Sequence, residues 1–211
     1  MTMAPEGIVY IVDDDEAVRD SLVMLLESRG HRTSSFASAE AFLGAVATPS
    51  LPGCLLLDVN MPGTGGLGLL GEIGRIAPRL PVLMITGRGE VAIAVQAMKA
   101  GARDFLEKPL DPDTLFALVD QALAASAQAA QAEEERSKAQ ASLDRLTPRE
   151  RSVFDRLAEG KTNKQVAAEL NISPRTIEIH RAKLMEKLRV TSVSELIGLS
   201  ARIDSGRKDR L

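Results

Sequence analysis

Residues 54–63 read CLLLDVNMPG, an apolar run that ends on an acid and is followed by a proline-glycine turn. A run without alternating polar residues is typical of a central parallel strand that is buried on both faces. Cys54 opens the run, so we interpret it as a small buried hydrophobic residue and not as a reactive thiol. The stretch therefore predicts the centre of a parallel sheet, with Asp58 at the carboxyl end of that strand.

Strand and helix signals alternate on both sides of this run. Short β-prone apolar runs occur at residues 8–12, 81–86 and 105–106, and residues 32–36 give a weaker strand signal. Helical spacing or capping residues mark 16–29, 38–47, 65–76, 90–100 and a start near 111–112, although five glycines weaken the third helix. Five strand–helix units in this order predict an α/β doubly wound, five-stranded parallel sheet, whose sites lie beyond the carboxyl ends of the strands.

From about residue 146 the chain reads as helix alone. Thr147 and Glu150 have the spacing of a capping box, with Pro148 at the first helical position. That helix is expected to end at Gly160, and further helices are expected at 163–170, 174–188 and 192–200. A tight break between the second and third of four short helices predicts a small all-α helix-turn-helix domain.

Residues 125–142, between the two halves, are rich in Ala, Gln and Glu and lack the Gly and Pro of a flexible linker. We therefore expect three parts: a domain at 1–124, a semi-rigid helical linker at 125–142 and a helix-turn-helix domain at 143–211. A coiled coil in the linker is a weaker alternative, because its seam would consist mostly of alanine.

Charge is divided unevenly between these parts. Residues 1–124 carry a net charge of −7 and residues 143–211 carry +5, within a total of −3. This asymmetry suggests that only the C-terminal part contacts a polyanion, although chance variation between two domains would also produce it. The single cysteine excludes an internal disulfide, and neither a membrane-spanning stretch nor a signal peptide is evident, so we expect a cytoplasmic protein without membrane contact.

Residues with complementary chemistry follow four of the expected strands. Residues 13–16 are acidic and follow the first strand, Asp58 follows the third, Thr86 ends the fourth and Lys108 follows the fifth. Carboxylates bind Mg²⁺ and can attack phosphorus, while a hydroxyl and an ammonium group bind phosphoryl oxygens. Taken singly, the acids are explained by a solvated loop or a helix cap and Lys108 by a surface lysine. The four positions together predict one site at the edge of the sheet.

Four segments of this half resemble the receiver domain of two-component response regulators, which has a flavodoxin-like fold. They are VDDD at 12–15, DVNMPG at 58–63, TG at 86–87 and KAGARDFLEKP at 99–109, within a match over roughly residues 7–124. The resemblance implies that Asp58 accepts a phosphoryl group from a histidine kinase, and that Thr86 and Lys108 bind this group. It also implies a cis Lys108–Pro109 bond. The Mg²⁺ ligands that it implies are Asp13, Asp14, Asp58 and the main-chain carbonyl of Asn60.

The same resemblance predicts a conformational switch. Thr86 is expected to shift toward the phosphoryl group and Phe105 to rotate into the vacated space, with a static core aromatic as the alternative. Receivers of this type dimerise through a surface that corresponds here to about residues 90–123. Gly65 stands where the family usually has Asp or Asn, a loss we expect to be small because glycine also caps helices. Asn60 and Arg88 occupy positions that tune the phosphoryl lifetime in the family, so the resemblance implies the same role for them here.

Three segments of the second half resemble the helix-turn-helix of the LuxR type, over about residues 143–203. They are LTPRER at 146–151, GKTNKQVA at 160–167 and ISPRTIEIH at 172–180. With the receiver-like half in front, the whole chain resembles the NarL/FixJ class, closest to its FixJ kind. Helical spacing places Ile177, Leu184 and Leu188 on the core side of the expected recognition helix.

Contacts to DNA are expected from the opposite face of that helix and its surroundings. The residues expected to reach the major groove are Arg175, Glu178, Ile179, Ala182 and Lys183, with Thr176 beside them. Phosphate contacts are expected from Lys164, His180, Arg181 and Lys187. The alternative is a solvated helix surface, and a lone histidine such as His180 is as often structural.

These observations favour a transcription regulator rather than an enzyme. Phosphorylation of Asp58 is expected to promote homodimerisation and binding to a two-fold operator in double-stranded DNA, with RNA polymerase as a further partner. An alternative that uses the same site is a phosphohydrolase with an Asp nucleophile, which turns over small phosphoesters repeatedly. Another is a phosphate shuttle or adaptor whose helix-turn-helix does not function; salt-dependent DNA binding by residues 143–211 alone separates this last alternative from a transcription regulator.

Overall fold

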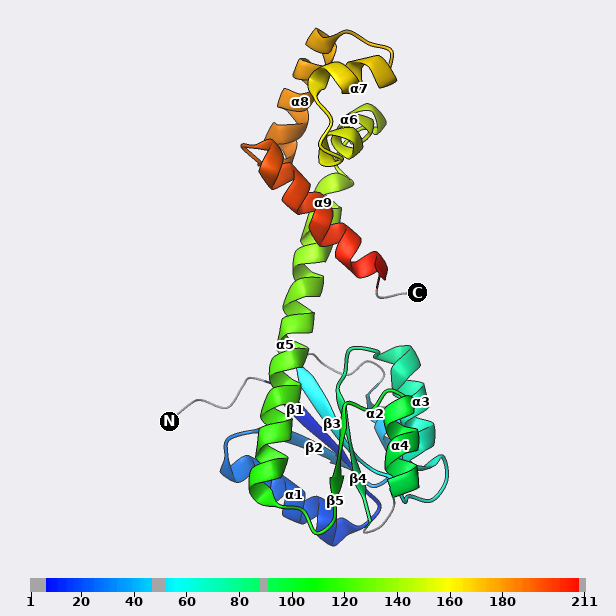
Figure 1. The fold of residues 1–211 in the computed structure, drawn as a ribbon. Coiled ribbons are helices and arrows are strands. Elements are labelled where there is room, and N and C mark those ends of the chain that lie inside the picture. The colour runs from blue at the N-terminus through cyan, green and yellow to red at the C-terminus, as the bar shows by residue number, and fades with distance from the viewer. Residues whose placement is uncertain (1–6, 47–51, 88–90, 209–211) are drawn as a thin grey trace. The chain divides into compact units, whose positions relative to one another are not determined.

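The structure, a computed structural model, describes residues 7–46, 52–87 and 91–208 (Figure 1). The chain divides into two compact units, Met1–Ala130 and Gln131–Leu211. Buried apolar residues form two clusters in the first unit and one cluster whose residues lie in the second. Each unit therefore has its own hydrophobic core.

The N-terminal unit is built on five parallel strands in the order β2-β1-β3-β4-β5. The strands are β1 (Ile8–Val12), β2 (Arg32–Phe36), β3 (Gly53–Asp58), β4 (Val82–Thr86) and β5 (Asp104–Glu107). The apolar run at residues 54–57 forms most of β3, the middle strand, and every residue of β3 is buried. The doubly wound parallel sheet predicted from the sequence is confirmed.

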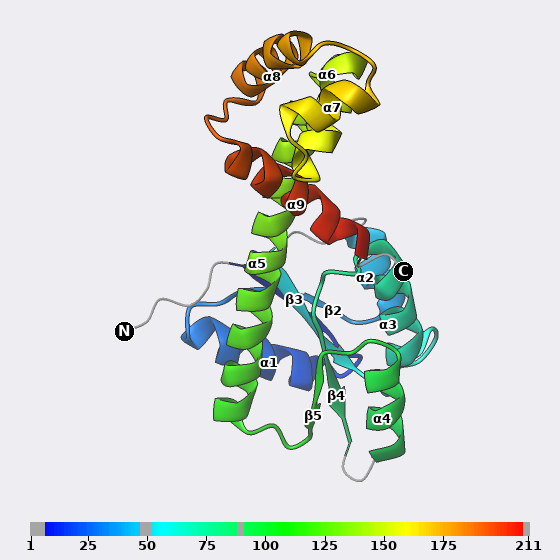
Figure 2. The ribbon, with the colours of Figure 1, turned by 45° about the horizontal axis from the view of Figure 1, so that its top comes forward.

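Helices cover both faces of this sheet (Figure 1, Figure 2). On one face lie α1 (Glu16–Ser28) and the first part of α5 (Pro112–Leu143). On the other face lie α2 (Ala39–Ala45), α3 (Gly65–Ile76) and α4 (Val91–Lys99). Alternate residues of β3 supply the two cores, because successive side chains of a strand point to opposite faces. Leu55 and Leu57 join one core, and Cys54 and Leu56 join the other.

The C-terminal unit is entirely helical in its described part. After the end of α5 it contains α6 (Pro148–Ala158), α7 (Asn163–Glu169), α8 (Pro174–Leu188) and α9 (Val193–Lys208). Side-chain caps from Thr147, Thr162 and Ser173 start α6, α7 and α8, and the predicted capping box of Thr147 with Glu150 is present. The predicted helical domain is confirmed, although α9 continues beyond the expected end at Ser200.

Two details at element ends differ from expectation. Gly65 does not cap α3 but is its first residue, in a left-handed conformation with φ +67°, and Thr64 occupies the capping position. Ser126 is fully buried and its hydroxyl accepts a hydrogen bond from the Gly53 N–H at 3.0 Å, so the packing of the first unit continues past residue 124. Sequence periodicity does not reveal the Ser126 bond, since it joins residues that are 73 positions apart.

Two further expectations concern Cys54 and membranes. Cys54 is fully buried, and burial raises the pKa of its thiol to about 12, so it behaves as the small hydrophobic residue we predicted. Among the helices of the described ranges, none combines the length and the apolar character that crossing a bilayer requires.

Candidate phosphorylation site and nucleic-acid interface

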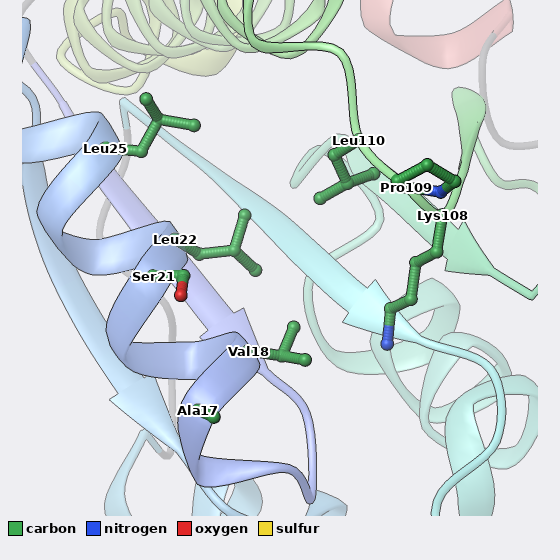
Figure 3. A pocket seen from close by; sticks show the side chains of 8 residues that line it. All are labelled: Ala17, Val18, Ser21, Leu22, Leu25, Lys108, Pro109 and Leu110. Atoms are coloured by element: carbon green, nitrogen blue, oxygen red, sulfur yellow. The ribbon is translucent and has the colours of Figure 1, made fainter.

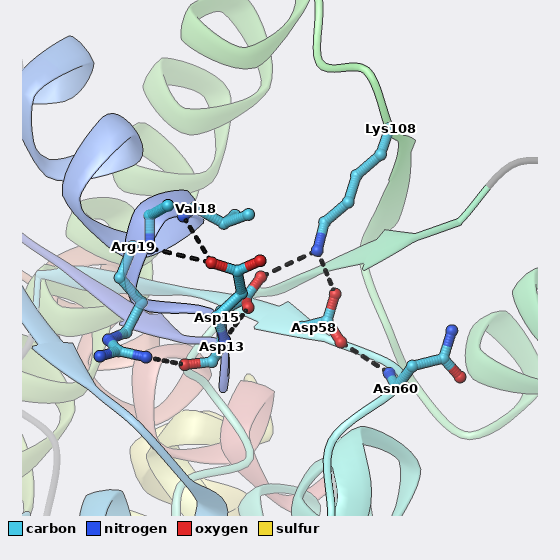
Figure 4. A network of polar contacts seen from close by, with 8 residues as sticks. Asp13, Asp15, Val18, Arg19, Asp58, Asn60 and Lys108 are labelled. Atoms are coloured by element: carbon cyan, nitrogen blue, oxygen red, sulfur yellow. Dashed lines mark hydrogen bonds and ion pairs between the residues drawn. The ribbon is translucent and has the colours of Figure 1, made fainter.

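Two buried carboxylates meet one lysine at the carboxyl edge of the sheet (Figure 4). Asp13 directly follows β1, Asp58 ends β3 and Lys108 directly follows β5. The Lys108 Nζ atom lies 2.9 Å from Asp13 Oδ2 and 2.6 Å from Asp58 Oδ1. Only 1% of Asp13 and 4% of Asp58 is exposed. The parallel topology thus brings together three residues that are far apart in the sequence.

Main-chain and side-chain donors fix the orientation of both carboxylates (Figure 4). The Asn60 N–H donates to Asp58 Oδ2 at 2.7 Å, and the Asp15 N–H donates to Asp13 Oδ1 at 2.9 Å. Arg19 donates through Nη1 to the main-chain oxygen of Asp13 at 2.8 Å, which anchors this turn to α1. Each carboxylate therefore presents one oxygen to Lys108 and has the other held by the backbone.

The electrostatic balance of this site is negative. Burial raises the pKa of the Asp58 carboxyl, and the nearby Asp13 charge adds to this, while Lys108 opposes it. Burial lowers the pKa of Lys108, but hydrogen bonds to Asp58 and Asp13 outweigh it, so the net shift is upward. Two carboxylates and one ammonium group leave one uncompensated negative charge, which favours binding of a further cation.

The chemistry of these donors fits Mg²⁺. Mg²⁺ keeps several waters and is usually held by one or two carboxylates together with phosphate oxygens. The buried carboxylates of Asp13 and Asp58 meet this requirement, whereas Asp14, the next residue in the chain and also a predicted ligand, has an exposed side chain. Within the described residues, no group of three or more His, Cys, Asp or Glu side chains is arranged to hold a metal. The two carboxylates that the fold brings together, those of Asp13 and Asp58, both contact Lys108.

Other acids and polar residues near this edge have separate positions. Asp15 caps α1, accepting from the N–H groups of Ala17 and Val18, so the alternative of a helix cap holds for this residue. Thr86 is buried at the end of β4, and its hydroxyl donates to the Gly87 carbonyl at 3.2 Å. Asn60 is exposed. Arg88, predicted to influence phosphoryl lifetime, and Glu90, at the start of the predicted dimer surface, lie outside the described residues.

Phe105 has its side chain partly in solvent. It is 44% exposed and lines a shallow apolar hollow with residues of α4, namely Ala94, Val95, Met98 and Lys99. The aromatic ring therefore lies on the outer side of β5 while the Thr86 hydroxyl is bound to Gly87. The movement of Thr86 and Phe105 between two states stays a prediction.

A second apolar hollow adjoins Lys108 on the other face of the sheet (Figure 3). Its walls are side chains of α1 and the segment after β5, where the Lys108–Pro109 bond is cis as predicted. The lining residues are Ala17, Val18, Ser21, Leu22, Leu25, Lys108, Pro109 and Leu110. Lys108 thus forms part of an apolar wall with its stem while its ammonium group reaches the carboxylates.

The two faces of α8 differ as predicted for a recognition helix. Ile177, Leu184 and Leu188 are buried in the core of the C-terminal unit, and Ile179 is 49% exposed on the outside. The other predicted contact residues with exposed side chains are Lys164, Arg175, Glu178, Ala182 and Lys183. Those with intermediate exposure are Thr176, His180, Arg181 and Lys187.

Several predicted DNA-contact residues have partners inside the protein. Lys187 Nζ lies 2.7 Å from Oε2 of Glu150, a buried residue of α6. The Lys187 hydrogen bond and the Thr147 N–H lower the pKa of Glu150 to about 2. Arg175 lies 3.1 Å from Glu178 on the same helix, and the Thr176 hydroxyl bonds to Ser173 in the helix cap.

Each half of the chain matches a known protein family. Residues 9–120 match the family described as "Response regulator receiver domain", and residues 144–200 match "Bacterial regulatory proteins, luxR family". The transcriptional regulatory protein FixJ of Bradyrhizobium diazoefficiens is 44% identical over 95% of this chain and 97% of its own. The response regulator protein TmoT of Ectopseudomonas mendocina is 38% identical over 96% of this chain and 92% of its own.

Solved structures agree with these matches. The response regulator StyR, known at low resolution, aligns with a TM-score of 0.81 at 37% identity, over 93% of this chain and 99% of its own. Full-length FixJ from B. japonicum aligns with a TM-score of 0.58 at 44% identity, over 95% and 98% of the two chains. A receiver domain implies a histidine kinase as partner, and a LuxR-family domain implies DNA. The chain therefore belongs to the two-component response regulators, as a transcription regulator that joins a receiver domain to a LuxR-type DNA-binding domain.

Proposed function

We propose that Asp58 is the phosphoryl acceptor and that its modification controls DNA binding by the C-terminal unit. The observation that carries this proposal is the buried cluster in which Lys108 Nζ contacts both Asp58 and Asp13. An oxygen of Asp58 attacks phosphorus, the phosphorus–nitrogen bond of a kinase phosphohistidine breaks, and the imidazole leaves with the electron pair of that bond. The product is an aspartyl phosphate on β3.

The neighbouring residues stabilise the charge that this step brings. Receiver domains generally bind Mg²⁺ at their phosphorylation site; we assign its ligands here to Asp13, Asp14, Asp58 and the carbonyl of Asn60. The metal neutralises phosphoryl oxygens when bound. Lys108 can leave Asp58 for a phosphoryl oxygen without losing Asp13, and the Thr86 hydroxyl can exchange the Gly87 carbonyl for another.

The proposed response follows from the charge that phosphorylation adds. An aspartyl phosphate brings a new group of strong acceptor oxygens, which draws Thr86 from Gly87 and lets Phe105 turn inward from its exposed position. The change at β5 favours homodimerisation through about residues 90–123. A dimer places two helix-turn-helix units on a two-fold site in double-stranded DNA, where RNA polymerase is recruited or blocked. We place the protein in the cytoplasm, where its kinase partner transfers phosphoryl groups and the chromosome lies.

The proposed division keeps residues 1–124 as receiver, 125–142 as helical linker and 143–211 as DNA-binding domain, with Ser126 at the start of the linker packed against the receiver. Within the last, the proposed DNA contacts are those predicted on α8 and at Lys164. The proposal assigns no enzymatic activity beyond the single phosphoryl transfer. Repeated turnover of small phosphoesters would instead favour the phosphohydrolase.

A comparison of wild type with Asp58→Asn tests the proposal. Both proteins are treated with phosphoramidate and Mg²⁺, and phosphorylated species are separated on a phosphate-affinity gel. DNA fragments selected with residues 131–211 then report affinity for each protein. We expect only the wild type to become phosphorylated and to bind more tightly after treatment. Equal DNA affinity of Asp58→Asn and phosphorylated wild type would contradict the mechanism.

A further inference from the structure

A glutamate on α2 holds the loop that leads from Asp58 to α3. Both the N–H and the hydroxyl of Thr64 donate to Oε1 of Glu40, at 3.0 and 2.6 Å. Gly63, directly before Thr64, has φ +77°, and a side-chain carbon there would lie 2.9 Å from the same oxygen. The loop thus approaches Glu40 closely, in a left-handed backbone conformation at Gly63 that residues with a side chain rarely adopt.

Helix α3 lacks a cap from its own sequence. Thr64 stands at the capping position in a helical conformation and makes no side-chain capping bond to the helix. Gly65, the next residue, has φ +67° and no side chain that could accept from the first N–H groups. Unsatisfied N–H groups at a helix start need an acceptor, and here the carboxylate of another helix supplies one at Thr64.

The same loop is connected to the phosphoryl acceptor at two points. The Asn60 N–H orients Asp58 Oδ2 at 2.7 Å, and the Gly66 N–H donates to the Val59 carbonyl at 3.2 Å. Gly66 also packs so tightly on the main chain of Asp58 that a side-chain carbon would lie 2.8 Å from Val59 Cα. A displacement of Thr64 is therefore transmitted to Asn60 and Asp58 through a short, tightly packed segment.

The Glu40 carboxylate is a permanent acceptor. Hydrogen bonds from the Thr64 hydroxyl, its own N–H and the Thr64 N–H lower the pKa of Glu40 to about 2. The group therefore stays ionised at every pH at which the protein functions. Charge-assisted hydrogen bonds of this kind are shorter and stronger than neutral ones.

We propose that Glu40 is a positioning residue of the phosphorylation site: it accepts from the N–H and the hydroxyl of Thr64, the residue before α3, and so holds the loop that carries Asn60. This inference rests on the proposed role of Asp58 as acceptor. Residues that orient metal or phosphate ligands from outside the site affect both affinity and rate, because they keep the ligand groups in their working geometry.

The test compares Glu40→Ala and Thr64→Val with wild type and with a control. Glu72→Ala is the control, since it removes a glutamate whose partner is Arg75 on the same helix, away from the loop. The rate of Asp58 phosphorylation by phosphoramidate is measured against Mg²⁺ concentration, and thermal unfolding is recorded for each protein. These measurements separate a change in Mg²⁺ affinity from a general loss of folded protein.

We expect Glu40→Ala to raise the half-saturating Mg²⁺ concentration about 10-fold, the lower end of the effect of such outer residues. Thr64→Val is expected to raise the half-saturating Mg²⁺ concentration by a smaller factor. The double variant is expected to have the same half-saturating concentration as Glu40→Ala alone. Glu40→Gln, which keeps an acceptor oxygen, is expected to recover part of the loss. Glu72→Ala is expected to match wild type.

An unchanged Mg²⁺ dependence in Glu40→Ala, whether or not its thermal stability falls, would overturn the positioning role. Fully additive effects of Glu40→Ala and Thr64→Val would do the same, since a shared contact predicts non-additivity. These results leave the proposed function intact as long as wild type is phosphorylated at Asp58. If wild type is not phosphorylated there, both proposals fail together.

Discussion

At Lys108 a single ammonium group serves two buried carboxylates. Asp13 and Asp58 each have almost no exposed surface, and Lys108 is the cation that contacts both. Burial of an unbalanced charge lowers the free energy of unfolding, because a low-dielectric environment favours the neutral form. The same excess negative charge favours binding of a cation and, with it, of a phosphoryl group. At these three residues, the charge that favours ligand binding therefore lowers the stability of the fold.

Removing one charge at a time should therefore change stability in opposite directions. Asp58→Asn leaves a balanced Asp13–Lys108 pair and is expected to raise the free energy of unfolding by about 1 kcal/mol. Lys108→Met leaves two facing carboxylates without a cation and is expected to lower it by about 2–3 kcal/mol. Urea denaturation at pH 7.5 in a metal-free buffer measures both. Lowering the pH toward 5 should reduce the loss of unfolding free energy in Lys108→Met, because the two carboxylates can then share a proton. If Asp58→Asn and Lys108→Met changed the free energy of unfolding in the same direction, this account would be refuted.

His31 provides a pH-dependent contribution to the stability of the N-terminal unit. It is buried between α1 and α5, with Nε2 3.4 Å from Asp120 Oδ1. Burial lowers the pKa of His31; Asp120 opposes this shift and Arg29 adds to it. When the pKa of a histidine is lower in the folded than in the unfolded state, the unfolded state binds the proton at a higher pH than the folded state does. Its contribution to stability is therefore complete above the unfolded pKa of about 6.5 and is lost as the pH falls below it.

Stability measured between pH 8 and pH 5.5 should accordingly fall less steeply in His31→Gln than in wild type. Asp58, with its raised pKa, changes stability with pH in the direction opposite to His31. Its contribution is the same in wild type and in His31→Gln, so the difference between the two proteins isolates His31. Chemical denaturation of the full chain, followed by circular dichroism, supplies the measurement. Parallel pH curves for wild type and His31→Gln would show that this histidine does not contribute.

Among the elements, α3 contains five glycines, and Gly66 is the one at which a side-chain carbon would collide with the backbone of β3 and the residue after it. Gly66 lies against the backbone of Asp58 and Val59, whereas a side-chain carbon at Gly71 would meet no atom within 4 Å. We expect Gly66→Ala to lower the free energy of unfolding by about 3 kcal/mol and to impair phosphorylation, because α3 must move off β3. Gly71→Ala is expected to add up to about 1 kcal/mol, the helix-propensity difference between the two residues. Thermal unfolding of both variants decides this, and a stable, phosphorylatable Gly66→Ala would contradict it.

Lys187 and Lys164 allow the two roles of basic residues in the helix-turn-helix to be separated. Lys187 on α8 contacts buried Glu150, whereas Lys164, in the first turn of α7, is exposed. Lys187→Met is expected to cost about 1–2 kcal/mol of stability in the C-terminal unit, because a buried carboxylate loses a charged partner. Lys164→Met is expected to leave stability unchanged, to weaken DNA binding and to reduce the slope of log affinity against log salt by about 1. A full salt slope in Lys164→Met would exclude a phosphate contact there.

Local sequence patterns predict the elements well where their cause is itself local. The apolar run of β3, the caps of α2 and α6 and the periodicity of α8 each depend on neighbouring residues, and the structure has them at the expected positions. The edge of acids and Lys108 was also predictable, because parallel strands direct their carboxyl ends to one side. Bonds between distant elements were not, as Glu40 with Thr64 and Glu150 with Lys187 show. The spacing of Glu150 from Thr147 predicts its capping role, but no local pattern indicates Lys187 as its partner or pairs Glu40 with Thr64.

On the scale of the whole molecule, the chain passes from one unit to the other within a single helix. α5 spans Pro112–Leu143, and the division into compact units falls between Ala130 and Gln131. Leu143 joins the core of the C-terminal unit. Helical periodicity continues through both parts, so the sequence alone does not show where one unit ends. The buried residues of α5 on the receiver side include Val119, Ala122, Leu123 and Ser126.

Fragments of the chain test where the receiver unit ends. A fragment of residues 1–124 lacks Ser126, so the buried Gly53 N–H at the start of β3 loses its acceptor. An unsatisfied buried donor costs about 1–3 kcal/mol, and we expect a fragment of residues 1–130 to be more stable than 1–124 by about that amount. Ser126→Ala within 1–130 should remove much of the gain, because alanine keeps the helix but offers no acceptor.

A fragment of residues 1–142 is the matched control, since the residues it adds belong to the second unit. We expect its free energy of unfolding, measured with urea, to equal that of 1–130. Equal stability of 1–124 and 1–130 would show that the hydrogen bond between Ser126 and Gly53 contributes nothing. A further rise from 1–130 to 1–142 would show instead that the receiver draws stability from the helix beyond Ala130, and the boundary of the unit would then have to be moved toward Leu143.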